Sequence, residues 1–386
     1  VTVNLVEGDY EVTALGTLTW REGDEFLAFG HSFLNKGWVE YGVGSAEILG
    51  VIDSREFPFK LGTASSCIGR VVQDRGAGVA GEFGVLPQMV KVTTEVMDEA
   101  SGLVRNYAFS VVNDEELLPG LVISGIMDTI DRTLDRIGSG TAEVYFELTG
   151  ENFPHFQRDN LFYGRDVAAV ALKEVGEILR VITENEFIHP QITGVKVRVK
   201  VKPGQLNARI SKAELPKEKF TPGEKVTLTI NLFPYRGEMV QIPLEIEIPA
   251  TPGKWLLMVY GNEFSFATEE QSENEEELYT PELYQSYTSL EEKLADYRKR
   301  PQNNRIMVEF IPAEGIPEEL GREDETRAEE GENPATADRF QTVSTAYYVT
   351  GEEQLLIEVV DPQAEENPKL PTIGPTIQPT IEAAEF

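Results

Sequence analysis

The sequence predicts a mainly β protein, with a β-barrel-type domain that carries a few helices and an Ig-like β-sandwich module after it. From residue 1 to about 110, short runs of β-branched and aromatic residues alternate with Gly or Asp at nearly every gap. Two stretches at helical spacing follow. After residue 193, strand patterns return with turns at Pro203-Gly204, Pro222-Gly223 and Pro252-Gly253, which is typical of sandwich modules.

The amino-acid composition excludes several classes of function and of site. The 386 residues include 66 Asp and Glu against 34 Lys and Arg, a net charge of −32, which repels phosphate backbones and argues against a nucleic-acid partner. No apolar run reaches the length of a transmembrane helix. Cys67 is the only cysteine, so an intramolecular disulfide or a Cys-based metal site is excluded. We expect no cofactor and no metal, because His31, His155 and His189 have no partners at ligand spacing.

The stretch from Gly16 to Gly37 organises the N-terminal part. Strand patterns on either side of Arg21-Glu22-Gly23-Asp24 predict a hairpin, and Gly30 then lets the backbone swing before His31. With only three histidines in the chain, His31 is one of few side chains able to move protons near neutral pH. The plainer alternative is a turn histidine that is hydrogen-bonded to nearby backbone.

Two helices are expected in the middle of the chain. The first spans about 117–137, ends at Gly138 as C-cap, and has one apolar face of Leu121, Ile123 or Ser124, Met127, Ile130, Leu134 and Ile137. The alternating run 141–148 predicts a strand. The second helix spans 166–181 and is broken by His189-Pro190.

These patterns divide the chain into five parts. We predict a β domain at 1–150, a helical connector at 151–192 and the Ig-like sandwich at 193–268. An acidic linker, a short helix at 288–299 and terminal strands fill 269–360, with disorder or a long excursion expected over 313–335. The Pro- and Glu-rich tail at 361–386 is expected to be extended and polyproline-like, either as a linker or as an arm docked on a partner.

Several motifs resemble the SpoIVB-type serine peptidases, in particular a large secreted bacterial branch. They are Gly16-Thr17-Leu18-Thr19, Ala28-Phe29-Gly30-His31, Phe59-Lys60-Leu61-Gly62-Thr63, Ile68-Gly69, and the run from Gln73 to Gly81, with one later motif at Pro234-Tyr235-Arg236-Gly237. The resemblance is good over 1–95 and thinner to about 150. It implies a chymotrypsin-like barrel, an extracytoplasmic location (secreted or cell-envelope), and His31 as the general base.

The family's nucleophile lies in a Gly-x-Ser-Gly-Ser-Pro turn, and this sequence contains no such turn. The nearest match is Ser139 in Gly138-Ser139-Gly140-Thr141, with a cap at the start of a strand as the plain alternative. Asp128 is the nearest match for the acidic member, although a helical Asp is usually solvated. Ser65 and Ser66 could face the same cleft. Asp74-Arg75 is expected to be an ion pair or a bonded turn, with a role in the site as the alternative.

In the secreted branch the serine turn lies upstream of the histidine hairpin. The resemblance therefore implies a nucleophile on a segment before Val1, and an exposed edge or groove within 1–150 where that segment pairs. The first hypothesis is thus a serine peptidase-related protein whose partner is a peptide or protein substrate, or an upstream segment of the same precursor, and which is inactive as this chain. The second is a non-catalytic extracytoplasmic scaffold or binding module on the same fold.

Overall fold

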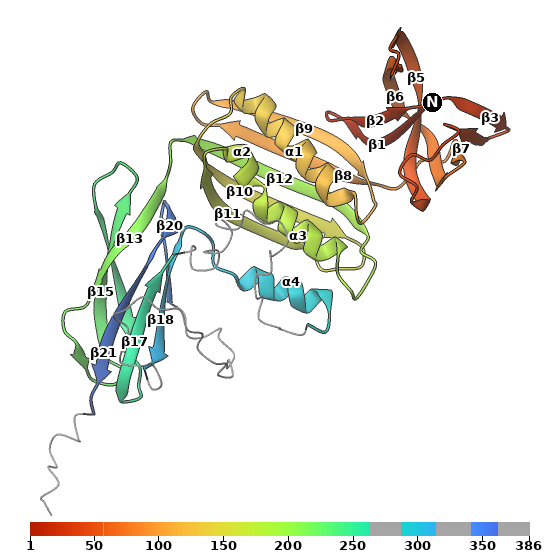
Figure 1. Ribbon diagram of the computed structural model, residues 1–386. Helices are drawn as coiled ribbons and strands as arrows, with labels where there is room; N and C mark the ends of the chain where they lie inside the picture. Colours follow the sequence, from red (N-terminus) through yellow and green to blue (C-terminus); the bar gives the residue numbers. More distant parts are fainter. Residues whose placement is uncertain (57, 262–286, 314–340, 362–386) are drawn as a thin grey trace, which may run out of the picture.

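The computed structural model describes residues 1–56, 58–261, 287–313 and 341–361, and it is mainly β, as predicted (Figure 1). One sheet of twelve strands runs through the N-terminal half, and sheets of four and five strands form the C-terminal part. Within these residues, no helix combines the length and the apolar character needed to cross a bilayer.

The N-terminal strands form a curled sheet, in the order β1-β5-β6-β7-β4-β3, with β2 on the other side of β1. Only Gly16 and Thr17 separate β2 from β3, so the sheet curls back toward β1 around a core that includes Phe26, Tyr41 and Val71. This curled sheet fits the predicted barrel-type unit. Its strands are β1 (Thr2–Gly8), β2 (Val12–Leu15), β3 (Leu18–Glu22), β4 (Glu25–Ala28), β5 (Gly37–Ile52), β6 (Phe59–Arg75) and β7 (Gly78–Phe83).

Strand β1 joins this curled sheet to a more open one. On one side its residues Thr2 to Asn4 pair with β5, and its residues Val6 to Gly8 pair with β9. The open part has the order β11-β10-β12-β8-β9, with β12 parallel to β8, and helices pack on one face (Figure 1). Its elements are β8 (Met89–Asp98), β9 (Leu103–Val112), α1 (Leu118–Leu134), β10 (Gly140–Gly150), β11 (Phe156–Gly164), α2 (Val167–Ala171), α3 (Lys173–Thr183) and β12 (Ile192–Pro203).

This open sheet differs from the predicted division of the chain. The boundaries expected after residues 150 and 192 fall inside it, because β10 pairs with β12 from Gly140 opposite Pro203 to Gly150 opposite Ile192. Residues 151–192 are therefore not a separate connector, since β11 supplies the sheet's edge strand and α3 packs beside α1. The first helix also ends earlier than expected, at Asp135 with φ 51°, and Ile137 is exposed.

The C-terminal part is a two-sheet sandwich with one shared core. One sheet has the order β16-β15-β13-β20 and the other β14-β21-β17-β18-β19. The predicted sandwich thus takes strands from both 193–268 and 269–360, and the run 195–201 belongs to the open sheet instead. Its strands are β13 (Asn207–Glu214), β14 (Lys219–Phe220), β15 (Lys225–Pro234), β16 (Val240–Glu247), β17 (Gly253–Tyr260), β18 (Arg305–Pro312), β19 (Gln341–Ser344), β20 (Tyr348–Thr350) and β21 (Glu352–Val359).

Helix α4 (Leu290–Lys299) links the two halves. Leu290, Leu294 and Tyr297 are buried in the core of the first half, and the Tyr297 hydroxyl donates to Glu177 of α3 at 2.8 Å. The expected linker at 269–277, nearly all of the charged stretch 313–335 and nearly all of the tail after Asp361 lie outside the described residues.

An open strand edge lies beside the N-terminus. Pairing between β1 and β5 stops at Thr2 opposite Gly44, and residues 46–52 of β5 pair only with 59–64 of β6 among the described residues. We call this two-stranded part of β5 and β6 the ribbon. The β5 edge of the ribbon continues the line of β1, so an edge of the kind expected within 1–150 is present.

A bidentate ion pair joins the end of β8 to the chain after α1, and it makes stability depend on pH. Both terminal nitrogens of Arg136 donate to the buried Asp98 carboxylate at 2.8 Å, and this guanidinium holds the Asp98 pKa far below its usual range. The contribution is complete above the unfolded pKa of about 3.9 and is lost as pH falls toward the folded pKa. We expect Asp98→Asn to lower the free energy of unfolding by about 2 kcal/mol at neutral pH, because a charge-assisted pair is lost.

Urea unfolding at a series of pH values tests this. The difference between Asp98→Asn and wild type should shrink below about pH 4, whereas the exposed control Asp53→Asn should match wild type throughout. A difference that is constant with pH would contradict the ion-pair explanation.

A second, fully buried pair connects β11 to α3 and to the chain after α4. Arg158 Nε donates to the Glu174 carboxylate, and the other Arg158 nitrogens donate to the carbonyls of Arg300 and Pro301. Arg158→Met should lower the free energy of unfolding by about 3–5 kcal/mol, because it leaves a buried carboxylate without its counter-ion. Arg158→Met combined with Glu174→Gln should regain part of that loss in urea unfolding. Exposed Arg165→Met is the control, and additive losses in the double variant would contradict the coupling.

Candidate functional site

The histidine loop begins where β4 ends in an unusual backbone conformation. Phe29 and Gly30 have φ of 73° and 78°, so the chain turns sharply before His31. The Phe29 ring then lies directly over Gly16, where an added Cβ would come within 1.9 Å of the ring. Gly16 is needed because no side chain fits between β2 and this ring.

His31 is exposed, and its two ring nitrogens have different environments. Nδ1 lies 2.7 Å from the carbonyl oxygen of Ser32, and the ring lies 5.6 Å from the Phe29 ring between centroids. Because a carbonyl oxygen only accepts, we assign the proton to Nδ1, which leaves a lone pair on Nε2. Among the described residues Nε2 has no partner. His31 is thus a turn histidine bonded to the backbone, as the plainer alternative expected. With the proton on Nδ1 and a lone pair on Nε2, its ring also has the tautomer that a general base requires.

A buried carboxylate fixes the loop that follows. Asp74 has no exposed surface, and it accepts hydrogen bonds from the backbone N–H of Phe33 at 2.8 Å and of Leu34 at 2.6 Å. Arg75 Nε donates to Gln73 instead. No ion pair joins Asp74 to Arg75 in the described ranges, and the Asp74 carboxylate bonds instead to the backbone of the histidine loop. Asp74 therefore holds the loop rather than facing a reacting group.

Lys36 ties the far end of the loop to the start of α1. Its Nζ lies 2.9 Å from Asp114 Oδ1 and 2.7 Å from Glu116 Oε2. Burial alone would lower the Lys36 pKa, but the bonds to Glu116 and Asp114 raise it above the ordinary value. The loop is thus fixed at both ends, which gives His31 a defined position on an otherwise exposed surface.

The other two predicted catalytic residues lie on the open-sheet part. Ser139 is exposed just before β10, and Asp128 on α1 is half-buried and paired with Arg132 Nε at 2.8 Å. In the described part of the chain no hydrogen bond or ion pair joins either residue to His31. The structure therefore does not bring the three side chains into one bonded set, and the catalytic roles of Ser139 and Asp128 remain predictions.

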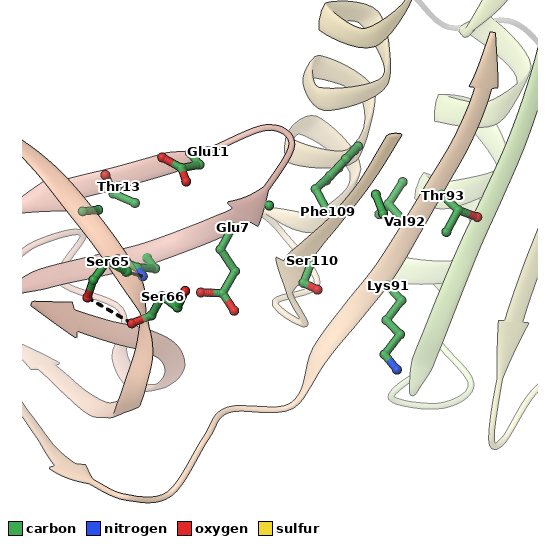
Figure 2. A pocket seen from close by; sticks show the side chains of 14 residues that line it. Glu7, Glu11, Thr13, Ser65, Ser66, Lys91, Val92, Thr93, Phe109 and Ser110 are labelled. Carbon is green, nitrogen blue, oxygen red and sulfur yellow. Dashed lines mark hydrogen bonds between the residues drawn. The ribbon is translucent and has the colours of Figure 1, made fainter. Parts of the chain in front are cut away.

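Ser65 and Ser66 lie on β6 and line a cavity of about 410 Å³ between the curled and open parts of the sheet. His31 is not among the residues that line it. Figure 2 shows Glu7 between Ser66 and the opposite wall, where Ser110 and Lys91 lie. Ser110 is directly opposite Glu7 on β1 and Lys91 on β8.

The sequence gives no signal for this polar cavity, because its residues come from strands that are far apart along the chain. Cys67 beside it is not a nucleophile: burial and the neighbouring Glu7 raise the pKa of its thiol to about 12, so it stays protonated at neutral pH. No group of three or more His, Cys, Asp or Glu in the described ranges could hold a metal ion. His155 and His189 pair instead with Glu147 and Glu115.

Replacing Asp74 tests its role in the loop. Asp74→Ala leaves two backbone N–H groups without acceptors, so we expect a loss of about 3 kcal/mol in the free energy of unfolding. Asp74→Asn keeps one acceptor oxygen and should lose less. Amide hydrogen exchange should accelerate at both Phe33 and Leu34 in Asp74→Ala and at only one of them in Asp74→Asn, and at neither in the exposed control Asp53→Ala. Unchanged exchange at these two amides would show that Asp74 does not hold the loop.

Comparisons with known proteins give no match to any family model, to any curated protein or to any solved structure at the significance required.

Proposed function

We propose that this chain is a SpoIVB-like serine peptidase-related protein in which His31 is the general base for peptide-bond hydrolysis. One observation carries the proposal: His31 is exposed on a fixed loop, with Nδ1 bonded to the Ser32 carbonyl and Nε2 without a partner among the described residues. Because the sequence lacks the Gly-x-Ser-Gly-Ser-Pro turn, we propose that this chain alone is inactive.

The two ring nitrogens of His31 would have different roles in peptide-bond hydrolysis. Nε2 would accept the proton of a serine hydroxyl as its oxygen attacks the peptide carbonyl, and would then return the proton to the leaving amine. The Nδ1–H bond to the Ser32 carbonyl would keep the ring in this orientation. A neutral carbonyl stabilises the imidazolium less than a carboxylate does, and both Asp74 oxygens already accept backbone bonds.

The open β5 edge gives the nucleophile a path to His31. Val1 and Gly16 exchange backbone hydrogen bonds, the Phe29 ring covers Gly16, and His31 lies beside that ring. A strand that continues β1 upstream of Val1 would pass Thr17 and pair with residues 46–52. We propose that an upstream segment of the same precursor brings the serine turn along this path, and that the substrate is a peptide or protein.

We extend the proposal to the two folded parts of the chain. The curled sheet would be a chymotrypsin-like barrel, and the C-terminal sandwich an Ig-like module in a bacterial, extracytoplasmic protein. The motifs between Gly16 and Gly81 support it.

A non-catalytic scaffold or binding module is the second candidate. Two observations favour it: Ser139 and Asp128 are not bonded to His31, and the Nδ1 bond to Ser32 is also what a structural turn histidine would make. In that case His31 would only complete the turn after β4.

A fluorophosphonate probe, which reacts with activated serines, separates the two candidates. We expect labelling only when the chain carries its natural upstream segment, and we expect His31→Ala to slow it by about 10²–10⁴-fold because proton transfer is lost. His189→Ala is the matched control, since that histidine is exposed and paired only with Glu115.

Three other labelling results would contradict the proposed role of His31 or of the upstream segment. Labelling of the 386-residue chain that disappears in Ser139→Ala would place the nucleophile at Ser139 and contradict the upstream assignment. Labelling that survives His31→Ala would remove His31 from the mechanism. No labelling in either form would favour the scaffold.

A further inference from the structure

One row of side chains at the cavity between the curled and open parts of the sheet carries both a negative and a positive charge. Glu7 on β1 and Lys91 on β8 are each directly opposite Ser110 on β9, so the three residues lie side by side across three strands. Because successive residues of a strand point to opposite faces, this row is turned away from the adjacent one. The adjacent row is completely buried in the core and consists of Val6, Val111 and Val90.

Lys91 differs from other lysines on this face of the open sheet. Lys200 pairs with Glu99 at 3.0 Å, and Lys202 pairs with Glu143. In the part of the chain that the structure describes, the Nζ of Lys91 makes no hydrogen bond and no ion pair. The chain has a net charge of −32, so carboxylates are abundant on its surface. An ammonium group at a cavity wall without a carboxylate partner is available to donate to an anionic group of a ligand.

The other end of the row provides acceptors. The Cys67 backbone N–H donates to Glu7 Oε2 at 3.1 Å, which positions the carboxylate, and a carboxylate can accept several such bonds. Asn4 also lines the cavity and is only 1% exposed. Its Nδ2 donates to the Ser65 carbonyl oxygen at 3.3 Å, whereas its Oδ1 has no partner among the described residues. Since a buried amide oxygen is nearly always hydrogen-bonded, Asn4 and Glu7 together favour a ligand that carries N–H groups.

The spacing along the row fits a small ligand that has both an ammonium and a carboxylate group. Side chains directly opposite each other on neighbouring strands have Cβ atoms about 5 Å apart, which places the Cβ atoms of Glu7 and Lys91 about 10 Å apart. An α-amino acid can lie over Ser110 between them, donating to Glu7 and accepting from Lys91 (Figure 2). The cavity volume of about 410 Å³ is within the usual range for small-molecule sites.

The opposite wall of the cavity indicates what the side chain of the ligand carries. The hydroxyls of Thr13, Ser65 and Ser66 and the carboxylate of Glu11 lie there (Figure 2). Hydroxyls both donate and accept, and Glu11 adds a second carboxylate to the cavity, so this wall suits a basic side chain. The net charge of −32 also draws cations toward the molecule.

We propose that this cavity binds a free α-amino acid with a basic side chain, with its α-ammonium group at Glu7 and its α-carboxylate at Lys91. This inference does not depend on the peptidase assignment, because His31 is not among the residues that line the cavity. The bound amino acid would connect β1 to β8 and so stabilise the junction between the curled and open parts of the sheet. Binding should therefore raise the melting temperature.

Isothermal titration calorimetry of the full chain with L-lysine and two analogues tests the proposal. Cadaverine is lysine without the carboxylate, and ε-aminocaproate is lysine without the α-ammonium group. We expect each analogue to bind roughly ten- to hundredfold more weakly than L-lysine, because each loses one charge-assisted hydrogen bond.

Variants of the two charged residues assign each group of the ligand to its partner. Lys91→Met and Glu7→Gln should each weaken L-lysine binding roughly ten- to hundredfold. In Lys91→Met, L-lysine should bind no more tightly than cadaverine, since the carboxylate has lost its donor. In Glu7→Gln, L-lysine should bind no more tightly than ε-aminocaproate. Glu7→Gln keeps an acceptor oxygen for the Cys67 N–H, so thermal unfolding without ligand should stay near wild type.

Matched controls come from an exposed pair on the sandwich. Lys225 and Glu245 lie 4.0 Å apart on β15 and β16, with side chains 66% and 74% exposed. Lys225→Met and Glu245→Gln change the net charge as the cavity variants do, and both should bind L-lysine like wild type. The proposal would be overturned by a failure of L-lysine to bind at millimolar concentrations, or by wild-type affinity in Lys91→Met and Glu7→Gln. Equal binding of L-lysine and cadaverine would also overturn it, since that shows only a general attraction of cations to an acidic chain.

Discussion

Strand β1 is the part of the structure on which the rest depends, because its backbone is buried and must be paired on both sides. Residues Thr2 to Val6 are all buried. Buried backbone groups are nearly always hydrogen-bonded, and β1 meets this requirement with three partners: β2 on one side, and β5 followed by β9 on the other. The change of partner from β5 to β9 is what joins the curled sheet to the open one. It also leaves the β5 edge open beyond Gly44.

The same strand positions the histidine loop. Val1 pairs with Gly16, and Gly16 provides the space that the Phe29 ring fills before His31. Beyond His31 the loop donates hydrogen bonds to two carboxylates, that of Asp74 within the curled sheet and that of Asp114 just before α1. The imidazole therefore lies on rigid supports although it is exposed. Rigid support is what a catalytic base needs, but a structural turn has it as well.

Local patterns in the sequence predicted those elements that are determined by residues close to one another along the chain. The hairpin around Gly23, the β-rich class and the helix before residue 134 follow from turn chemistry and periodicity. The open sheet could not be predicted in the same way, because β12 pairs in parallel with β8 about a hundred residues earlier. The domain boundaries expected after residues 150 and 192 therefore fell inside that sheet. His31 stood out because histidines are rare in the chain, whereas Ser110 between Glu7 and Lys91 depends on strand register that no spacing reveals.

The net charge of the molecule decides which partners it attracts and which it repels. With a net charge of −32, the surface attracts cationic segments and repels anionic ones, including other copies of itself. A peptide approaching His31 would meet that field, so basic segments would arrive faster and the preference would weaken with salt. Self-association responds in the opposite direction, because screening removes the repulsion between copies. Ionic strength therefore separates these two kinds of contact.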